Sequence, residues 1–314
     1  MTRPISAAAA TLALALLAAG PADAWSREGH MLTATIAYDD LMARDPAAAV
    51  AIAAIIDHHP DRGTFQVATA GVSADDRTLR LMMECARWPD DTRNTPFDHP
   101  TWHYADIAAR GPGAPADLPT TVSGQSLEAL NLNFKEAADP QAPIADRALA
   151  LCWVMHLAGD VHQPLHTASL YSTAYPHGDL GGGLQFVRSP ETKEVVSLHW
   201  YWDDRLNHGA DALATATLAK TLETRFPRGQ LSEIDAAHPA DFVTWEAESH
   251  VLATEYAYPT TLVTSTTKDS GPTVPADYSK MVADISARRL ALAGYRLAEL
   301  LRLIAAAPPA KDAK

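Results

Sequence analysis

Two histidine–aspartate pairs with the same spacing are the residues best suited to chemistry in this sequence. His156 and Asp160 enclose Leu-Ala-Gly, and His199 and Asp203 enclose Trp-Tyr-Trp. On a helix, this i,i+4 spacing puts both side chains on one face, about 5–6 Å apart at Cβ. Imidazole nitrogens and carboxylate oxygens are common zinc ligands. With His166 following shortly after Asp160, the two pairs predict a metal site.

The sequence around His156 and Asp160 strengthens this prediction. A single His-x3-Asp pair is more often a surface pair, but residues 143–161 form the most apolar helical pattern of the chain. A buried carboxylate without a partner costs several kcal/mol, so Asp160 needs a cation. The HExxH string of zinc proteases is absent, which disfavours that class.

Three further strings add possible ligands. Asp90 follows Trp-Pro at a predicted helix end, residues 102–106 read Trp-His-Tyr-Ala-Asp, and Trp25 stands five residues before His30. If the chain is cut before Trp25, its α-amine and carbonyl oxygen could chelate a metal. Each string also has a structural interpretation: an exposed cap at Asp90, a core histidine at 103, or a frayed Trp25.

Composition limits the other functions. The chain has 25 Lys+Arg against 38 Asp+Glu, a net charge of −13, and 13 histidines. This excludes the general basic surface of an affinity-driven DNA binder. Two cysteines exclude a disulfide-dense scaffold and a four-cysteine zinc module. Because Cys85 and Cys152 both lie in apolar predicted helices, we expect free buried thiols, with a bridge as the alternative.

The first 24 residues have the pattern of a secretory signal peptide. Arg3 precedes an apolar run over residues 7–19, and Ala22-Asp23-Ala24 is a small-x-small cleavage site. The run is too short to span a bilayer, so we expect export to the periplasm or the extracellular medium without stable membrane association. A buried core helix is the alternative. Residues 308–314 are expected to form a disordered tail.

The remaining chain predicts a single all-α domain over residues 25–307. Asp45 and Ser73 are suited to cap helices, and Pro89 is expected to end one. No βαβ alternation occurs, which disfavours a parallel sheet. Residues 184–187 and 194–197 could form a small β-hairpin. The predicted helices cover residues 30–44, 47–57, 75–87, 126–138, 143–161, 199–206, 210–224, 239–256 and 278–306.

Taken together, these strings resemble the S1/P1 nuclease family, which is related to zinc-dependent bacterial phospholipase C. The resemblance implies a compact helical domain of that type and a monomer. It extends from Trp25 to about Ile304. The matching strings are Trp25–His30, Trp88–Asp90, His103–Asp106, His156–His166, Leu198–Asp203, Trp245–Ser249 and Ala293–Ala298.

The resemblance also implies three zinc ions and their ligands. The first ion takes Asp90, His103, His156 and Asp160, the second takes His166, His199 and Asp203, and the third takes the α-amine and carbonyl oxygen of Trp25 with His30 and Asp160. Asp160 then bridges two ions. His162 is expected to pack or hydrogen-bond behind the ligands. No metal role is expected for His58, His59, His99, His177, His208, His238 or His250.

The implied activity is cleavage of single-stranded DNA and RNA to 5′-phosphorylated products, and of 3′-nucleotides. Asp90 and Asp160 act through the metals, and Arg93 meets the phosphate unless it is a solvated charge. Tyr104 stacks on a base and Asp106 hydrogen-bonds the base edge. Gly183 replaces a family asparagine, which leaves one substrate contact in doubt. The alternatives are a phospholipase C, ranked second because the second site ends in Asp rather than Glu, and a zinc-binding protein without catalysis.

Overall fold

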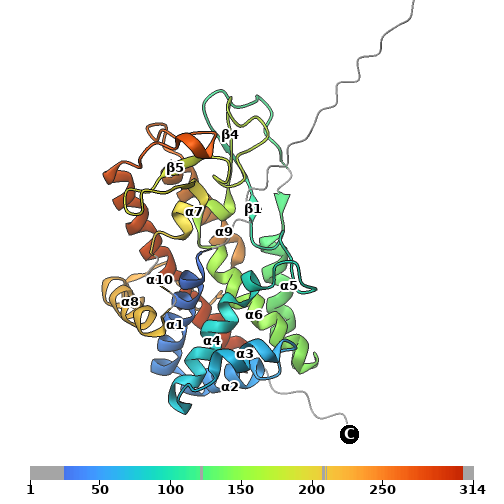
Figure 1. The fold of residues 1–314 in the computed structure, drawn as a ribbon. Coiled ribbons are helices and arrows are strands. Elements are labelled where there is room, and N and C mark those ends of the chain that lie inside the picture. Colours follow the sequence, from blue (N-terminus) through green and yellow to red (C-terminus); the bar gives the residue numbers. More distant parts are fainter. Residues whose placement is uncertain (1–24, 121–122, 207–208, 210, 307–314) are drawn as a thin grey trace, which may run out of the picture.

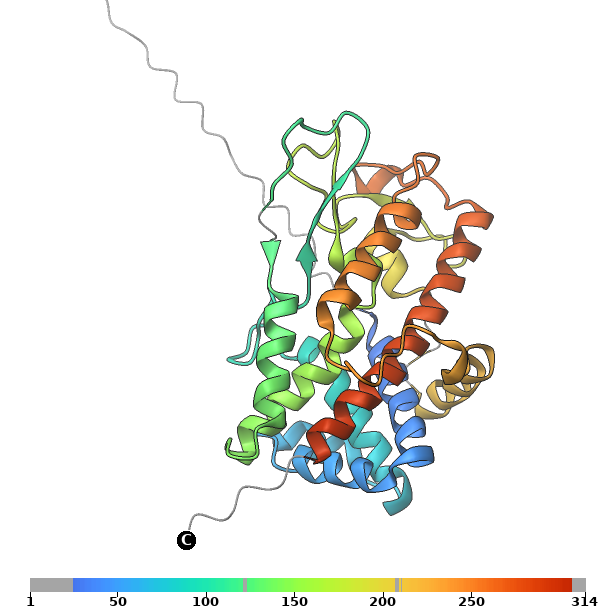
Figure 2. The same ribbon diagram turned by 180° about the vertical axis from the view of Figure 1, so that it is seen from behind.

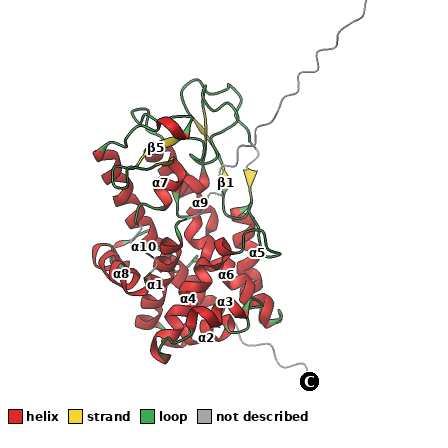
Figure 3. Cartoon of the chain, in the orientation of Figure 1, coloured by secondary structure: helices red, strands yellow, loops and turns green. Residues whose placement is uncertain are grey.

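The structure is a computed structural model that describes residues 25–306 except 121–122, 207–208 and 210. The predicted signal peptide, the tail and His208 lie outside the described residues. Figures 1 and 3 show a mainly helical molecule whose short strands gather at one end, which confirms the all-α prediction. The α-helices are α1 Arg27–Arg44, α2 Pro46–Ile56, α3 Arg62–Thr69, α4 Ala74–Asp91, α5 Ser126–Ala138, α6 Ile144–Asp160, α7 Leu198–Asp203, α8 Ala212–Arg225, α9 Phe242–Leu252 and α10 Ala276–Ala306.

The strands form three two-stranded pairs. The expected hairpin is confirmed as an antiparallel pair of β5 (Phe186–Arg188) and β6 (Val195–Ser197). Two further pairs contradict the prediction that only the hairpin would be strand. β1 (Ala105–Asp106) pairs antiparallel with β3 (Ser123–Gly124), and β2 (Ala108–Arg110) pairs parallel with β4 (Ser169–Tyr171). These strands are too short for any periodicity in the sequence to reveal them. Short turns of other helix types are η1 Pro164–Thr167, η2 Arg228–Gln230, η3 Ala253–Ala257 and η4 Lys268–Ser270.

The predicted caps are present, but the predicted end of α4 is wrong. The Asp45 side chain accepts from the amide of Ala48, and Ser73 accepts from that of Asp76. However, α4 continues through Pro89 to Asp91. A proline lacks the amide donor of one intrahelical bond, so α4 continues for two residues beyond Pro89 without that bond. Sequence analysis also missed the short helix α3.

Helix α6 is the centre of the main core. Nearly every side chain from Arg147 to Asp160 is buried, as expected for a helix that is apolar on all sides. It packs on α4 and α5, while the long helix α10 runs along α1 (Figure 2). Among the described residues, no helix is long and apolar enough to cross a membrane.

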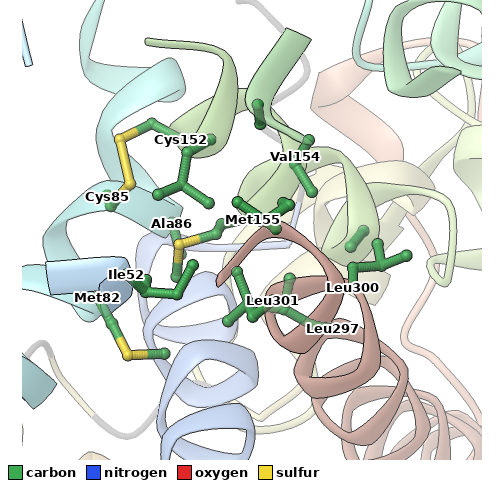
Figure 4. Packing of buried hydrophobic residues seen from close by; sticks show 14 of the residues in the cluster. Ile52, Met82, Cys85, Ala86, Cys152, Val154, Met155, Leu297, Leu300 and Leu301 are labelled. Atoms are coloured by element: carbon green, nitrogen blue, oxygen red, sulfur yellow. A yellow bond between two sulfur atoms is a disulfide. The ribbon is translucent and has the colours of Figure 1, made fainter. Parts of the chain in front are cut away.

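The prediction of two free thiols is wrong, because Cys85 and Cys152 form a disulfide (Figure 4). Both residues lie in apolar helices as expected and are fully buried. The sequence does not reveal that α4 and α6 pack side by side, which brings the two cysteine Cα atoms to 4.7 Å from each other. That separation is within the range that a disulfide spans.

Candidate metal centre

The Asp160 carboxylate, at the end of α6, lies beside three imidazole rings. Asp160 is fully buried, with Oδ2 3.2 Å from both His103 Nδ1 and His156 Nε2, and Oδ1 3.3 Å from His30 Nε2. Asp90 approaches the same group, with Oδ1 3.6 Å from His156 Nε2. These five residues form what we call the α6 cluster. They come from α1, α4, α6 and the turn before β1, so only the folded chain assembles them.

Each ring of the α6 cluster is oriented by its surroundings. His156 and Asp160 share one face of α6, as their spacing predicts. His156 Nδ1 donates to the carbonyl of Ala86 at 2.8 Å, which directs Nε2 toward the carboxylates. The rings of His30 and His156 stack with centroids 3.9 Å apart. Such hydrogen bonds to the second ring nitrogen are usual for metal-ligating histidines.

A second group lies between α7 and η1. His199 Nε2 is 3.4 Å from Asp203 Oδ2 and 3.1 Å from His166 Nε2, and all three side chains are buried. His199 Nδ1 donates to the carbonyl of Gly181 at 2.8 Å, and His166 Nδ1 donates to that of His103 at 2.7 Å. We call His166, His199 and Asp203 the α7 cluster.

The protonation of the α7 cluster indicates what it can bind. Because both Nδ1 atoms donate to carbonyls, both Nε2 atoms present lone pairs. Burial, together with the neighbouring His199, lowers the pKa of His166 to about 3, and burial lowers that of His199 to about 4. At neutral pH, two unprotonated nitrogens therefore face each other beside the Asp203 carboxylate. Three converging electron-pair donors without a proton fit a bound cation.

The α6 cluster has the opposite protonation. Burial lowers the pKa of His156, but the facing carboxylates of Asp160 and Asp90 outweigh burial and raise it to about 9. The pKa of Asp160 is held well below its usual range because His156 and His103 outweigh the effect of burial. The metal-free cluster thus carries a proton where a metal ion would compensate the same two carboxylates. Its ligand atoms lie within 4.8 Å of one another in two overlapping groups, His30/His156/Asp160 and Asp90/His103/His156.

The predicted substrate residues lie around these clusters. Arg93 Nη2 is 3.4 Å from Asp90 Oδ1, so its guanidinium reaches the α6 cluster. Tyr104 is half-buried beside His103. Burial, and then the charge of Asp179, raises the pKa of Asp106 on β1 to about 7. Arg93 therefore contacts a residue of the α6 cluster, whereas Tyr104 and Asp106 follow His103 closely in the chain.

Gly183 lies in the loop that supports His199. A Cβ at this position would lie 3.0 Å from the carbonyl oxygen of Leu180, with Leu180 and Asp179 as its nearest neighbours. The loop reaches the α7 cluster through Gly181, whose carbonyl accepts from His199. Gly183 is thus linked to the α7 cluster by the loop backbone, two residues after the carbonyl that accepts from His199.

Trp25, the third predicted ligand position, lies at the start of the described chain. Its ring is fully buried, and Nε1 donates to the carbonyl of Gly159 at 3.0 Å. The next amide, of Ser26, donates to the carbonyl of Asp203 at 3.3 Å. The start of the described chain is therefore held between the ends of α6 and α7.

His162 packs behind the ligands, as predicted. Its Nδ1 donates to the carbonyl of Ala158, and its Nε2 accepts from Arg296 at 2.9 Å. The family-like strings near the C-terminus supply this surrounding, because Glu248 pairs with Arg296 and Trp245 packs on the His162 ring. The other predicted non-ligand histidines that the structure describes lie outside the metal groups: His58, His59, His99, His177, His238 and His250.

Sequence analysis missed several groups that position the ligands. Gln163 donates to Asp203 Oδ1 at 2.5 Å, and the carbonyls of Ala86 and Gly181 orient two histidines. Gly159 is the clearest case: a Cβ there would lie 2.9 Å from His30 Nδ1 and 3.1 Å from Cε1. The one glycine of α6, directly before Asp160, was the available signal.

The two clusters should differ in the pH dependence of metal binding. At pH 7, zinc must displace the His156 proton, so affinity at the α6 cluster should rise about tenfold per pH unit below pH 9. His166 and His199 are already unprotonated, so affinity at the α7 cluster should be nearly flat between about pH 6 and 8. His199→Ala disables the α7 cluster, so a calorimetric zinc titration of this metal-free variant measures the α6 cluster. His156→Ala disables the α6 cluster, so the same titration measures the α7 cluster. Equal pH slopes would contradict the assigned protonation.

Gly159→Ala should disturb His30 while leaving the fold intact. The stacked His30 ring cannot move away from an added methyl without losing its place beside Asp160, and such overpacking costs about 1–3 kcal/mol. We expect a lower melting temperature and loss of metal bound by His30. Gly63→Ala in α3 is the matched control, because no atom lies within 4 Å of its Cβ position. If both variants retain the parent metal content, Gly159 has no positioning role.

Comparisons with known proteins place the chain among nucleases. The family described as S1/P1 Nuclease matches residues 25–306. Nuclease S1 of Aspergillus oryzae is 27% identical over 334 residues, which span 98% of this chain and the whole of that protein. Endonuclease 5 and endonuclease 4 of Arabidopsis thaliana are 29% and 30% identical, each over 51% of this chain and 52% of the relative.

Proposed function

Because the chain belongs to the S1/P1 nuclease family, and is therefore a nuclease, we propose that it is an exported three-zinc phosphodiesterase for single-stranded nucleic acids. It would cleave single-stranded DNA and RNA to 5′-phosphorylated products and also act on 3′-nucleotides. The observation that carries this proposal is the convergence of buried His and Asp ligand atoms into three groups.

The donor set fits zinc in the α6 and α7 clusters. Asp90, His103, His156 and Asp160 would hold one ion, His166, His199 and Asp203 a second, and His30 with Asp160 and a freed Trp25 a third. Zinc bound there supplies a Lewis acid that polarises a phosphoryl oxygen and acidifies water. Asp160 would align two of the ions, since each of its oxygens faces different rings.

The remaining residues would bind and orient substrate. Arg93 is placed to meet a phosphate oxygen, and it is held at the site by Asp90. Tyr104 offers a partly exposed ring to an unpaired base, which suits single strands because stacking requires an accessible base face. Asp106 can hydrogen-bond the base edge. The pairing of β1 with β3 and of β2 with β4 fixes this segment beside η1.

Export is supported by the disulfide, since disulfides persist in oxidising compartments outside the cytoplasm. The contacts of Trp25 support a link between export and activity. In the precursor, the Trp25 nitrogen is an amide, which cannot donate a lone pair to zinc as an amine does. Cleavage after Ala24 would therefore complete the third site.

Processing tests both the function and the third site. Protein that starts at Trp25 should hold about three zinc ions per chain. It should cleave single-stranded DNA in preference to duplex. A chelator should abolish cleavage and lower the melting temperature, because the ligands lose their counter-cations. The zinc content is measured by elemental analysis. Absence of chelator-sensitive cleavage would reject the proposed function.

Two extended forms are the controls for Trp25. A form with one additional N-terminal glycine and the uncleaved precursor should remain folded, hold fewer tightly bound zinc ions and lose most of the activity. Zinc binding by the Trp25 amine should release a proton near neutral pH, because an α-amine has a pKa of about 7.7–8.0. If the glycine-extended form keeps full activity and zinc content, Trp25 is not a ligand.

Tyr104→Ala should weaken binding of single-stranded oligonucleotides by about 1–3 kcal/mol, the contribution of one lost stack. Tyr104→Phe retains the ring and should bind like the parent. Both variants should keep the parent zinc content, since the Tyr104 side chain is outside the metal groups. Oligonucleotide affinity is measured by fluorescence anisotropy. Equal affinity of the alanine variant and the parent would show that Tyr104 does not stack.

A further inference from the structure

The Cys85–Cys152 disulfide joins the two helices that carry most of the α6 cluster. Figure 4 shows it between α4 and α6 within the main hydrophobic core. Both cysteines are fully buried, so the bridge is enclosed by the two helices and their neighbours. The proposed reaction does not use it.

The bridge lies next to the hydrogen bond that orients His156. Cys85 directly precedes Ala86, whose carbonyl accepts from His156 Nδ1 at 2.8 Å. Cys152 is one helical turn before His156 on the same helix. The disulfide and the hydrogen bond therefore both join α4 to α6, and their attachment points on α6 are one turn apart. A shift of one helix against the other would strain both.

The same turn of α6 also supports His103. Trp153 follows Cys152, and its ring lies 5.4 Å from the His103 ring and 4.8 Å from that of Trp102. The segment that presents His103 to Asp160 thus packs against the bridged turn. A change in the position of this turn would reach His103 as well as His156.

The α6 cluster needs such a restraint because its two carboxylates lie on different helices and face the same imidazole nitrogen. Asp90 on α4 and Asp160 on α6 both point at His156 Nε2, at 3.6 and 3.2 Å. A shift of α4 against α6 would therefore move Asp90 relative to both His156 and Asp160. A bond between the helices resists that movement and keeps the ligands in place for the metal.

The α7 cluster depends on a different part of the core. The apolar residues around His166, His199 and Asp203 belong to a second hydrophobic cluster that contains Leu165, Leu198, Tyr201 and Trp202. The disulfide belongs to the first. Loss of the bridge should therefore affect the two metal groups unequally.

We propose that the Cys85–Cys152 disulfide is a positioning device for metal binding, which holds α4 and α6 at the separation that the α6 cluster requires. This inference rests on the proposed function, because it assumes that the cluster binds zinc. Its effect is unequal: it maintains zinc affinity mainly at the α6 cluster, and the α7 cluster is reached only through the hydrogen bond from His166 to the His103 carbonyl.

The test replaces the bridge by apolar pairs of similar volume. Cys85→Val with Cys152→Ala, and the reverse pair Cys85→Ala with Cys152→Val, are each made in the His199→Ala and the His156→Ala backgrounds. Competitive zinc titration of metal-free protein then measures one cluster at a time. In the His199→Ala background, zinc affinity should fall roughly 10- to 100-fold, the range for a lost outer contact of a ligand. In the His156→Ala background, zinc affinity should fall by less than tenfold.

Val154→Ala is the matched control, since it removes side-chain volume from the same helix and the same core without breaking the bridge. It should lower the melting temperature and leave zinc affinity at both clusters unchanged. Unchanged affinity of both cysteine pairs, or equal weakening at both clusters, would overturn the inference while the proposed function stands. A parent protein that binds no zinc would overturn both.

Discussion

The structure depends on the need to compensate a carboxylate in the interior. The Asp160 side chain is fully buried and has no contact with solvent. It lies against the rings of His30, His103 and His156. An unpaired charge in such a place would cost several kcal/mol, so the surrounding helices must deliver partners to it. Four separate segments end at this point, and the buried faces of α1, α4 and α6 are arranged around it. A proton on His156 compensates it in the metal-free protein, and a metal ion can take the place of that proton.

Backbone groups connect the two clusters into one centre. The carbonyl of His103, a residue of the α6 cluster, accepts from His166 of the α7 cluster. The amide of Ser26 reaches the carbonyl of Asp203. Meanwhile the apolar residues next to the ligands fall into three hydrophobic clusters: Trp153 and Met155 belong to the first, Leu198 and Trp202 to the second, and Trp25 and Leu32 to the third. Rigid packing therefore supports each ligand group separately, and hydrogen bonds fix their relative positions.

The proposed zinc sites would explain how a chain with net charge −13 can act on a polyanion. A basic surface would attract nucleic acid everywhere, whereas bound cations place positive charge only where the phosphate must sit. Arg93, held by Asp90, would add one cation at the same point. Under the proposed function, recognition would come from contacts with bases at Tyr104 and Asp106, and such stacking favours unpaired strands without sequence preference.

The sequence by itself determined the parts that depend on local geometry. Helical periodicity predicted most of the helices, although not α3. The i,i+4 spacing of His156 with Asp160 and of His199 with Asp203 predicted two ligand pairs, because neighbours on one helix face need no knowledge of the fold. Only the tertiary structure decided which helices touch. It paired Cys85 with Cys152, contrary to the prediction, and it formed the short strand pairs that contain β1 and β2. It also brought the His30 ring against Gly159, where a side chain would collide with it. These features arise between residues far apart in the chain, where spacing carries no information and the packing of side chains determines the contacts.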